Sequence, residues 1–87
     1  MSLVKSSSVS VGVAATAFAT SDAPRVRRVH LTNVGAATVY LGGSGVTTAQ
    51  GFPLVANATL QLILDLDALF GIVTTGTVDV RVMEVFP

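Results

Sequence analysis

Apolar side chains recur at every second residue along most of this 87-residue chain. The pattern is clearest in two stretches, Leu60, Leu62 and Leu64, and Val78, Val80 and Val82. A period of two sends successive side chains to opposite faces of a strand, so each stretch predicts a strand with one buried face. No stretch carries the i, i+3, i+4 apolar stripe of a helix, and the best helical candidate, residues 64–70, is too short to change this interpretation.

Turn-forming residues divide the chain at intervals of about 8–12 residues, the spacing of small β-sandwiches and barrels. The turn signals lie at residues 21–24, 33–35, 42–45, 50–51, 57, 65–67 and 75–76. The strands predicted between them are residues 7–13, 15–19, 26–34, 37–42, 52–55, 58–64, 69–73 and 77–86. Their connections are too short for parallel crossovers, so the strands should pair antiparallel. We therefore expect an all-β fold: one domain, residues 1–87, forming a small antiparallel β-sandwich or jelly-roll-like barrel of about seven or eight strands.

The first part of the chain, residues 1–12, admits two interpretations, an edge strand or an arm that adds to the sheet of a neighbouring subunit. Val9, Val11 and Val13 alternate with small or polar residues, which favours a strand over the continuous apolar run of a secretory signal peptide. No apolar run in the sequence reaches the ~18–20 residues of a membrane helix, so we expect no membrane association.

Charge is scarce in this sequence, and its balance excludes several classes of function. Charged residues make up 11% of the chain, and five Lys and Arg balance five Asp and Glu. A nucleic-acid-binding protein needs a surplus of basic residues to displace counterions, so no nucleic-acid partner is expected. The apolar content of 51% is equally unlike a disordered tail. A small domain with a charge-poor surface favours association, so we expect a homo-oligomer or a place in a larger assembly.

Residues that could carry chemistry are few and isolated. His30 is the only histidine and has no partner at metal-ligand spacing, so we place it on the solvent or interface face of a strand. Asp65 and Asp67 lack the continuation of a calcium loop and are interpreted as a turn. Ser44 lies in a glycine-rich loop that lacks the Lys-Ser/Thr of a phosphate loop and has only His30 as a base. The chain has no cysteine, which excludes disulfides, thiolate zinc sites and cysteine nucleophiles. Taken together, these residues predict no enzymatic activity, cofactor or metal site.

Several large side chains are candidates for an interface. Tyr40, Ile63 and Met83 fall on the faces opposite the alternating valines and leucines of their strands. Phe52 lies at the start of a predicted strand and Phe86 near the end of the sequence. Interfaces favour aromatic residues and Met, although a second layer of core would use the same residues.

Arg27 and Arg28 interrupt the apolar alternation near residue 26, and we include both in the candidate interface. A β-bulge that re-aims one arginine would explain the interruption. Two solvated arginines that protect an edge strand would explain it equally well.

The order of the segments resembles a known family. The segments are VHLTNVG at 29–35, TVYLGG at 38–43, VTT at 46–48, GFPL at 51–54, LQL at 60–62, LFGI at 69–72 and GTVDVRV at 76–82. Together they resemble small β-sandwich virion structural proteins of tailed bacteriophages, notably those of actinobacterial hosts, over about residues 26–85. These segments are strand-and-turn patterns rather than chemical motifs.

The resemblance implies a head decoration or minor capsid protein with no catalytic residues, located in the virion on the capsid surface. We accordingly expect a non-enzymatic viral structural protein that decorates or cements the shell by contacting the major capsid protein lattice. A trimer at a capsid three-fold axis is the favoured homo-oligomer. The alternatives are a tail, baseplate or fibre component and a carbohydrate-binding or adhesion module. The last is disfavoured because the chain has no Trp and one Tyr.

Overall fold

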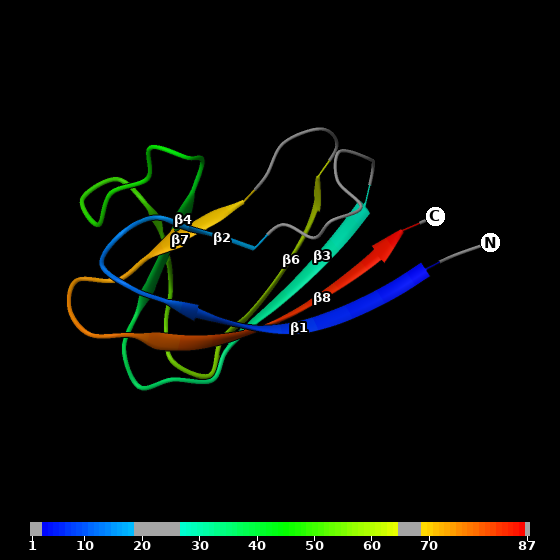
Figure 1. Cartoon of the computed structure of the whole chain (residues 1–87), viewed down its shortest axis with the longest axis horizontal. Helices are drawn as coiled ribbons and strands as arrows, with labels where there is room; N and C mark the ends of the chain where they lie inside the picture. Colours follow the sequence, from blue (N-terminus) through cyan, green and yellow to red (C-terminus); the bar gives the residue numbers. More distant parts are fainter. Residues whose placement is uncertain (1–2, 19–26, 65–68, 87) are drawn as a thin grey trace.

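The computed structural model describes residues 3–18, 27–64 and 69–86, which form eight β-strands in two antiparallel sheets (Figure 1). In chain order the strands are β1 (Leu3–Val11), β2 (Thr16–Ala17), β3 (Arg27–Asn33), β4 (Val39–Gly42), β5 (Phe52–Leu54), β6 (Thr59–Leu64), β7 (Phe70–Ile72) and β8 (Val78–Phe86). This architecture confirms the all-β sandwich that the alternation and the turn spacing predict.

One sheet, the long sheet, has the strand order β1-β8-β3-β6 and consists of strands of six to nine residues. The other, the short sheet, has the order β2-β7-β4-β5 and consists of strands of two to four residues. The open edges are therefore β1 and β6 in the long sheet and β2 and β5 in the short sheet. Leu3 pairs with Phe86, which places the start of β1 beside the end of β8 at one end of the long sheet (Figure 1).

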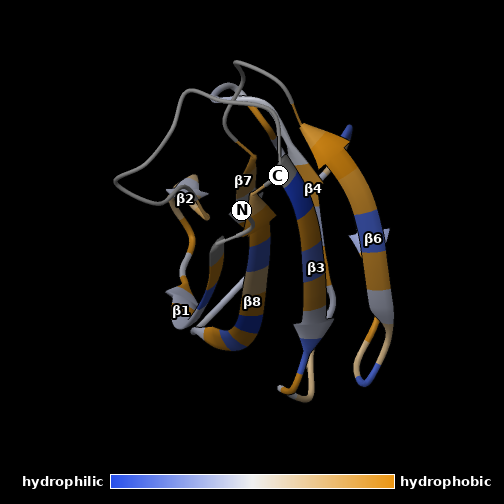
Figure 2. Ribbon diagram, turned by 90° about the vertical axis from the view of Figure 1, so that its right-hand side faces the viewer, coloured by the Kyte–Doolittle hydropathy of each residue, from blue (hydrophilic) through white to orange (hydrophobic). Residues whose placement is uncertain are grey.

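The core lies between the inner faces of the two sheets. Along β8, Val78, Val80 and Val82 are buried while Asp79 and Arg81 are exposed, as the period of two predicts. The same alternation appears as bands of hydropathy along β8 and β3 in Figure 2. The buried cluster comprises Val11, Phe18, Val29, Leu31, Val39, Leu41, Leu54, Val73, Val78, Val80 and Val82.

Strand β1 begins earlier than the sequence pattern predicts, at Leu3 rather than at residue 7. Its serines, Ser6, Ser7 and Ser8, provide no apolar alternation, yet each pairs in register with a residue of β8. Residues 3–11 are thus an edge strand of the chain's own sheet, because the long hydrophobic strand β8 offers them a continuous pairing partner.

Neither explanation of the interruption at Arg27 and Arg28 holds for strand β3 as the structure describes it. It lies between β8 and β6, so these arginines do not protect an edge strand. Its register with β6 runs without a break from Arg27 to Thr32, and its register with β8 runs from Arg28 to Asn33, so β3 contains no bulge. Val29 and Leu31 occupy buried positions on the inner face of β3, and the neighbouring Arg28 is exposed.

The turns follow their predicted residues where the structure describes them. Asn57 adopts a φ of 66° and Gly76 a φ of 70°, the left-handed conformation that Asn and Gly tolerate best. The glycine-rich segment beginning at Gly42 leads from β4 into its antiparallel partner β5, as a hairpin connection should. The predicted turn at Asp65 and Asp67 lies outside the described residues.

Candidate interaction surfaces

The outer face of the long sheet, which points away from the core, is organised into rows of paired residues. Read across β1, β8, β3 and β6, the rows are Val4, Val85, Arg28, Ile63; then Ser6, Met83, His30, Gln61; then Ser8, Arg81, Thr32, Thr59. The first row lies nearest the chain ends. The surface therefore changes from apolar to polar along the strands.

The apolar end of this face consists of Val4, Val85, Ile63 and Met83, with Arg28 among them. The exposed fractions are 58% for Val4, 68% for Ile63 and 39% for Met83. Single exposed apolar residues are ordinary, but adjacent ones in paired rows are typical of an interaction surface. The aliphatic stem of an arginine extends such a surface while its guanidinium remains available for an acceptor on a partner.

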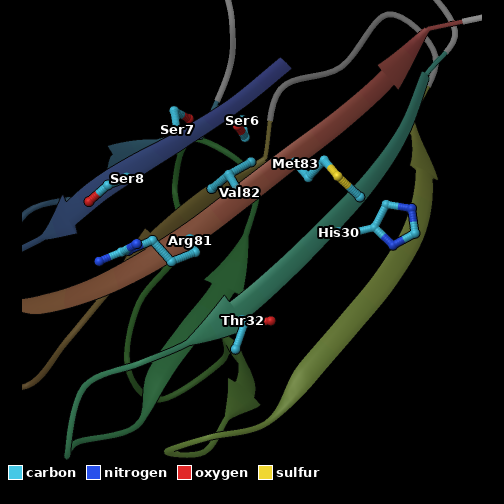
Figure 3. A pocket seen from close by; sticks show the side chains of 8 residues that line it. All are labelled: Ser6, Ser7, Ser8, His30, Thr32, Arg81, Val82 and Met83. Carbon is cyan, nitrogen blue, oxygen red and sulfur yellow. The ribbon is translucent and has the colours of Figure 1, made fainter. Parts of the chain in front are cut away.

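The polar part of the face is an open hollow of about 480 Å³ (Figure 3). It is lined by residues of β1, β8 and β3, with Met83 beside His30 at one end and Arg81 at the other. The hydroxyl oxygens of Thr32 and Thr59 lie 3.0 Å apart across β3 and β6 and share a hydrogen bond. The hollow thus presents hydroxyl groups, an imidazole and a guanidinium to solvent.

The serines of this hollow are poorly placed to act as nucleophiles with His30. Ser6 and His30 belong to the same row, but Met83 of β8 lies between them. Strands are about 4.8 Å apart, so the backbones of β1 and β3 are separated by about 9–10 Å. A nucleophile and its base need direct hydrogen-bond contact. Within the described ranges, no group of three His, Asp or Glu side chains could hold a metal ion.

A second surface, the edge groove, opens between the two sheets where β6 and β5 form their edges. It measures about 320 Å³, and its lining is almost wholly apolar: Leu41, Gly42, Phe52, Leu60, Leu62 and Leu69. Phe52 is 62% exposed at its rim, and Leu60 and Leu62 are half-buried. Among the described residues, the sandwich is therefore incompletely closed along this side.

The residues predicted as a candidate interface do not form one surface. Arg28, Ile63 and Met83 come together at the apolar end of the outer face. Phe52 instead lines the edge groove, while Tyr40 is half-buried opposite Pro53 and Ile72 on the outer face of the short sheet. The side chain of Arg27 lies outside the described part of the structure.

Phe86 has no exposed surface and belongs to the core side of β8. Phe86 lies four residues after Val82 and therefore on the same, inward face of β8. The alternation in the sequence contains this signal, but the position of Phe86 near the end of the sequence makes it hard to recognise. Val85, in phase with Met83, is the residue of the apolar end that the sequence reasoning missed on this strand. Glu84 is buried among the same inward positions and pairs in register with Lys5 of β1 and Val29 of β3.

None of the described residues lies in a helix long and apolar enough to cross a membrane. No protein-family model, curated protein or solved structure matches this chain.

Proposed function

We propose that this protein is a non-enzymatic structural protein of a bacteriophage virion that decorates or cements the capsid shell through protein–protein contacts. The observation that carries the proposal is the apolar end of the outer face, where Val4, Ile63 and Met83 are exposed around Arg28. A sheet face with neighbouring exposed apolar residues and few charges is suited to docking on a protein surface. The resemblance of residues 26–85 to virion β-sandwich proteins supplies the class of partner, the major capsid protein lattice.

The physical effect of such docking follows from mass action. A protein that binds the assembled lattice, but not its dissociated subunits, lowers the free energy of the assembled state at every occupied site. Many copies on a symmetric shell would add their effects, so each contact can be modest. The trimer at a capsid three-fold axis stays a prediction.

The test is cosedimentation of purified protein with capsids that lack it. Val4→Asp places a charge within the apolar end, whereas Ser8→Asp places the same charge on the same strand and face, two rows away. We expect wild type and Ser8→Asp to bind alike and Val4→Asp to bind at least about tenfold more weakly, as removal of a buried apolar contact predicts. Absence of wild-type binding to capsids would contradict the proposal.

Two further measurements separate the alternatives. Labelled protein on tails rather than heads in electron micrographs would assign it to the tail, baseplate or fibre. Capsids with and without the protein should differ in thermal and osmotic stability if it cements the shell. Equal stability with full binding would leave surface display as its role.

A further inference from the structure

Strand β6 is an edge strand of the long sheet that contains none of the usual protective residues. Among the described residues its only strand neighbour is β3, and it forms the right-hand margin of the molecule in Figure 2. Its sequence, TLQLIL, contains no charge, proline or glycine. Proteins usually protect edges with charged residues, proline or very short strands. The other edges have such protection: β1 carries Lys5, β5 carries Pro53, and β2 has two residues.

The hydrogen-bond pattern fixes which groups β6 directs outward. The amide of Asn33 donates to the carbonyl of Ala58 at 3.1 Å, and the amide of Val34 donates to the carbonyl of Asp79 at 3.1 Å. Odd residues of β3 therefore bond to β6 and even ones to β8, because antiparallel ladders alternate.

Combined with the register of β3 and β6, this alternation shows which residues of β6 bond to β3 and which direct their backbone groups away from it. Leu60, Leu62 and Leu64 direct their N–H and C=O groups toward β3. Thr59, Gln61 and Ile63 therefore direct three donors and three acceptors toward the open edge. These groups form a template for one more antiparallel strand, and the edge groove lies directly beside it on the inner side.

We propose that β6 pairs with β6 of a second copy of this chain about a two-fold axis perpendicular to the long sheet. The pairing places Gln61 opposite Gln61 of the second copy and Thr59 opposite Ile63. This register uses all three outward donors and all three outward acceptors of each strand. It also keeps matching faces together, because Leu60 then meets Leu62 on the inner side.

A second copy of the chain covers both the outward backbone groups of β6 and the edge groove at once. A two-fold axis perpendicular to the sheet leaves the two short sheets on the same side of the joined sheet. The two edge grooves then face each other, so that Phe52, Leu60 and Leu62 of one copy cover the same residues of the other. An isologous contact of this kind needs one self-complementary patch, which this edge supplies.

Charge and size set the expected strength of the pair. Among the described residues, neither β6 nor the groove lining carries a charge, so these residues of two copies do not repel each other. A standard stable interface of about 800 Å² per partner would cover about a sixth of the 4851 Å² surface of this chain. A contact of one strand edge and one groove belongs to the smaller, reversible class, so we expect a Kd on the order of 10 µM. This pairing goes beyond the proposed function and does not depend on it, and it predicts a dimer in solution where the resemblance to virion proteins predicts a trimer.

Sedimentation equilibrium tests the pair directly, from about 1 to about 500 µM, which brackets the expected Kd. Gln61→Pro removes an amide that points outward, and no bond within the sheet should be lost. Ser8→Pro is the matched control, because the same alternation directs the amide of Ser8 outward from the opposite edge, β1. We expect wild type and Ser8→Pro to dimerise alike and Gln61→Pro to dimerise at least about tenfold more weakly.

A second variant keeps the test informative if Gln61→Pro unfolds. The chain contains no cysteine, so Gln61→Cys introduces a single thiol. Opposite residues in a hydrogen-bonded antiparallel pair have Cα atoms about 5.5 Å apart, within the range of a disulfide. We expect Gln61→Cys to form a covalent dimer under mild oxidation much faster than Ser8→Cys. A wild-type monomer at every concentration, a trimer, or equal cross-linking of the two variants would overturn the two-fold pair.

Discussion

The side-chain amide nitrogen of Asn33 donates a 2.9 Å hydrogen bond to the backbone carbonyl of Leu54, which joins β3 of the long sheet to β5 of the short sheet. The same nitrogen donates to the carbonyl of Ala37 at 2.8 Å, and the side-chain oxygen accepts the amide of Gly35 at 2.9 Å. Asn33 is completely buried. Both side-chain donor hydrogens and the acceptor are thus used, so this polar side chain ties the two sheets together without an unsatisfied group.

Asn33→Ala should lower the free energy of unfolding by roughly 2–4 kcal/mol, because it removes the three hydrogen bonds of a completely buried side chain. Asn33→Asp should also destabilise, since an acceptor oxygen would then face two carbonyl oxygens. Urea denaturation measures both effects. Ser10→Ala, at an exposed position of β1, is the control and should stay within about 0.5 kcal/mol of wild type. An equally small effect of Asn33→Ala would contradict this role for the residue.

Gly71 provides the space in which the ring of Phe18 packs on β7. A Cβ atom at Gly71 would lie 2.6 Å from Cζ of Phe18 and 3.1 Å from Cγ1 of Val39. Gly71→Ala should therefore cost roughly 1–3 kcal/mol by overpacking, whereas Gly43→Ala, with nothing within 4 Å, is the control. Because Leu is shorter than Phe, Phe18→Leu should partly rescue Gly71→Ala in thermal unfolding. Strictly additive effects of the two changes would argue against this contact.

Local patterning predicts the elements of this fold because it depends on neighbouring residues alone. The alternation of Val78, Val80 and Val82 fixes which face of β8 is buried, whatever strand lies beside it. Asn57 and Gly76 mark turns because their own backbones tolerate a positive φ. The phase of Met83 and Ile63 likewise predicts that both face away from the core.

The pairing of strands is not local, and the sequence does not reveal it. Met83 and Ile63 share a surface only because β3 lies between β8 and β6 and places Arg28 and His30 between them. The interruption at Arg28 suggests an edge strand when it is considered alone, yet β3 is central. Asn33 is recognisable as a turn residue, but its bond to Leu54 joins positions 21 residues apart in different sheets.

The two phenylalanines of the candidate interface should behave differently in the monomer. Phe86 has no exposed surface, so Phe86→Ala should cost about 3–5 kcal/mol. Phe52 is 62% exposed, and Phe52→Ala should cost less than about 1 kcal/mol, because most of its ring already contacts water. Both losses in the free energy of unfolding should be measured by denaturation at low micromolar protein concentration, where self-association contributes little. Similar costs for the two changes would contradict their assignment to core and rim.

The backbone amides of two adjacent serines of β1, Ser7 and Ser8, point in opposite directions. Ser7 pairs with Val82, and the ladder phase set by Val34 and Asp79 directs the amide of Ser7 toward β8 and that of Ser8 away from it. Ser7→Pro should therefore remove a ladder hydrogen bond and lower the free energy of unfolding by about 1–3 kcal/mol.

Ser8→Pro removes no such bond and should cost clearly less than Ser7→Pro in the same urea titration. Amide hydrogen exchange on wild type provides an independent measurement, with slow exchange at Ser7 and fast exchange at Ser8. Fast exchange at Ser7 and slow exchange at Ser8 would mean that the hydrogen-bonded positions of β1 are shifted by one residue from this assignment. The same error would move the outward groups of β6 from Gln61 to its neighbours, because one alternation runs through all four strands of the long sheet.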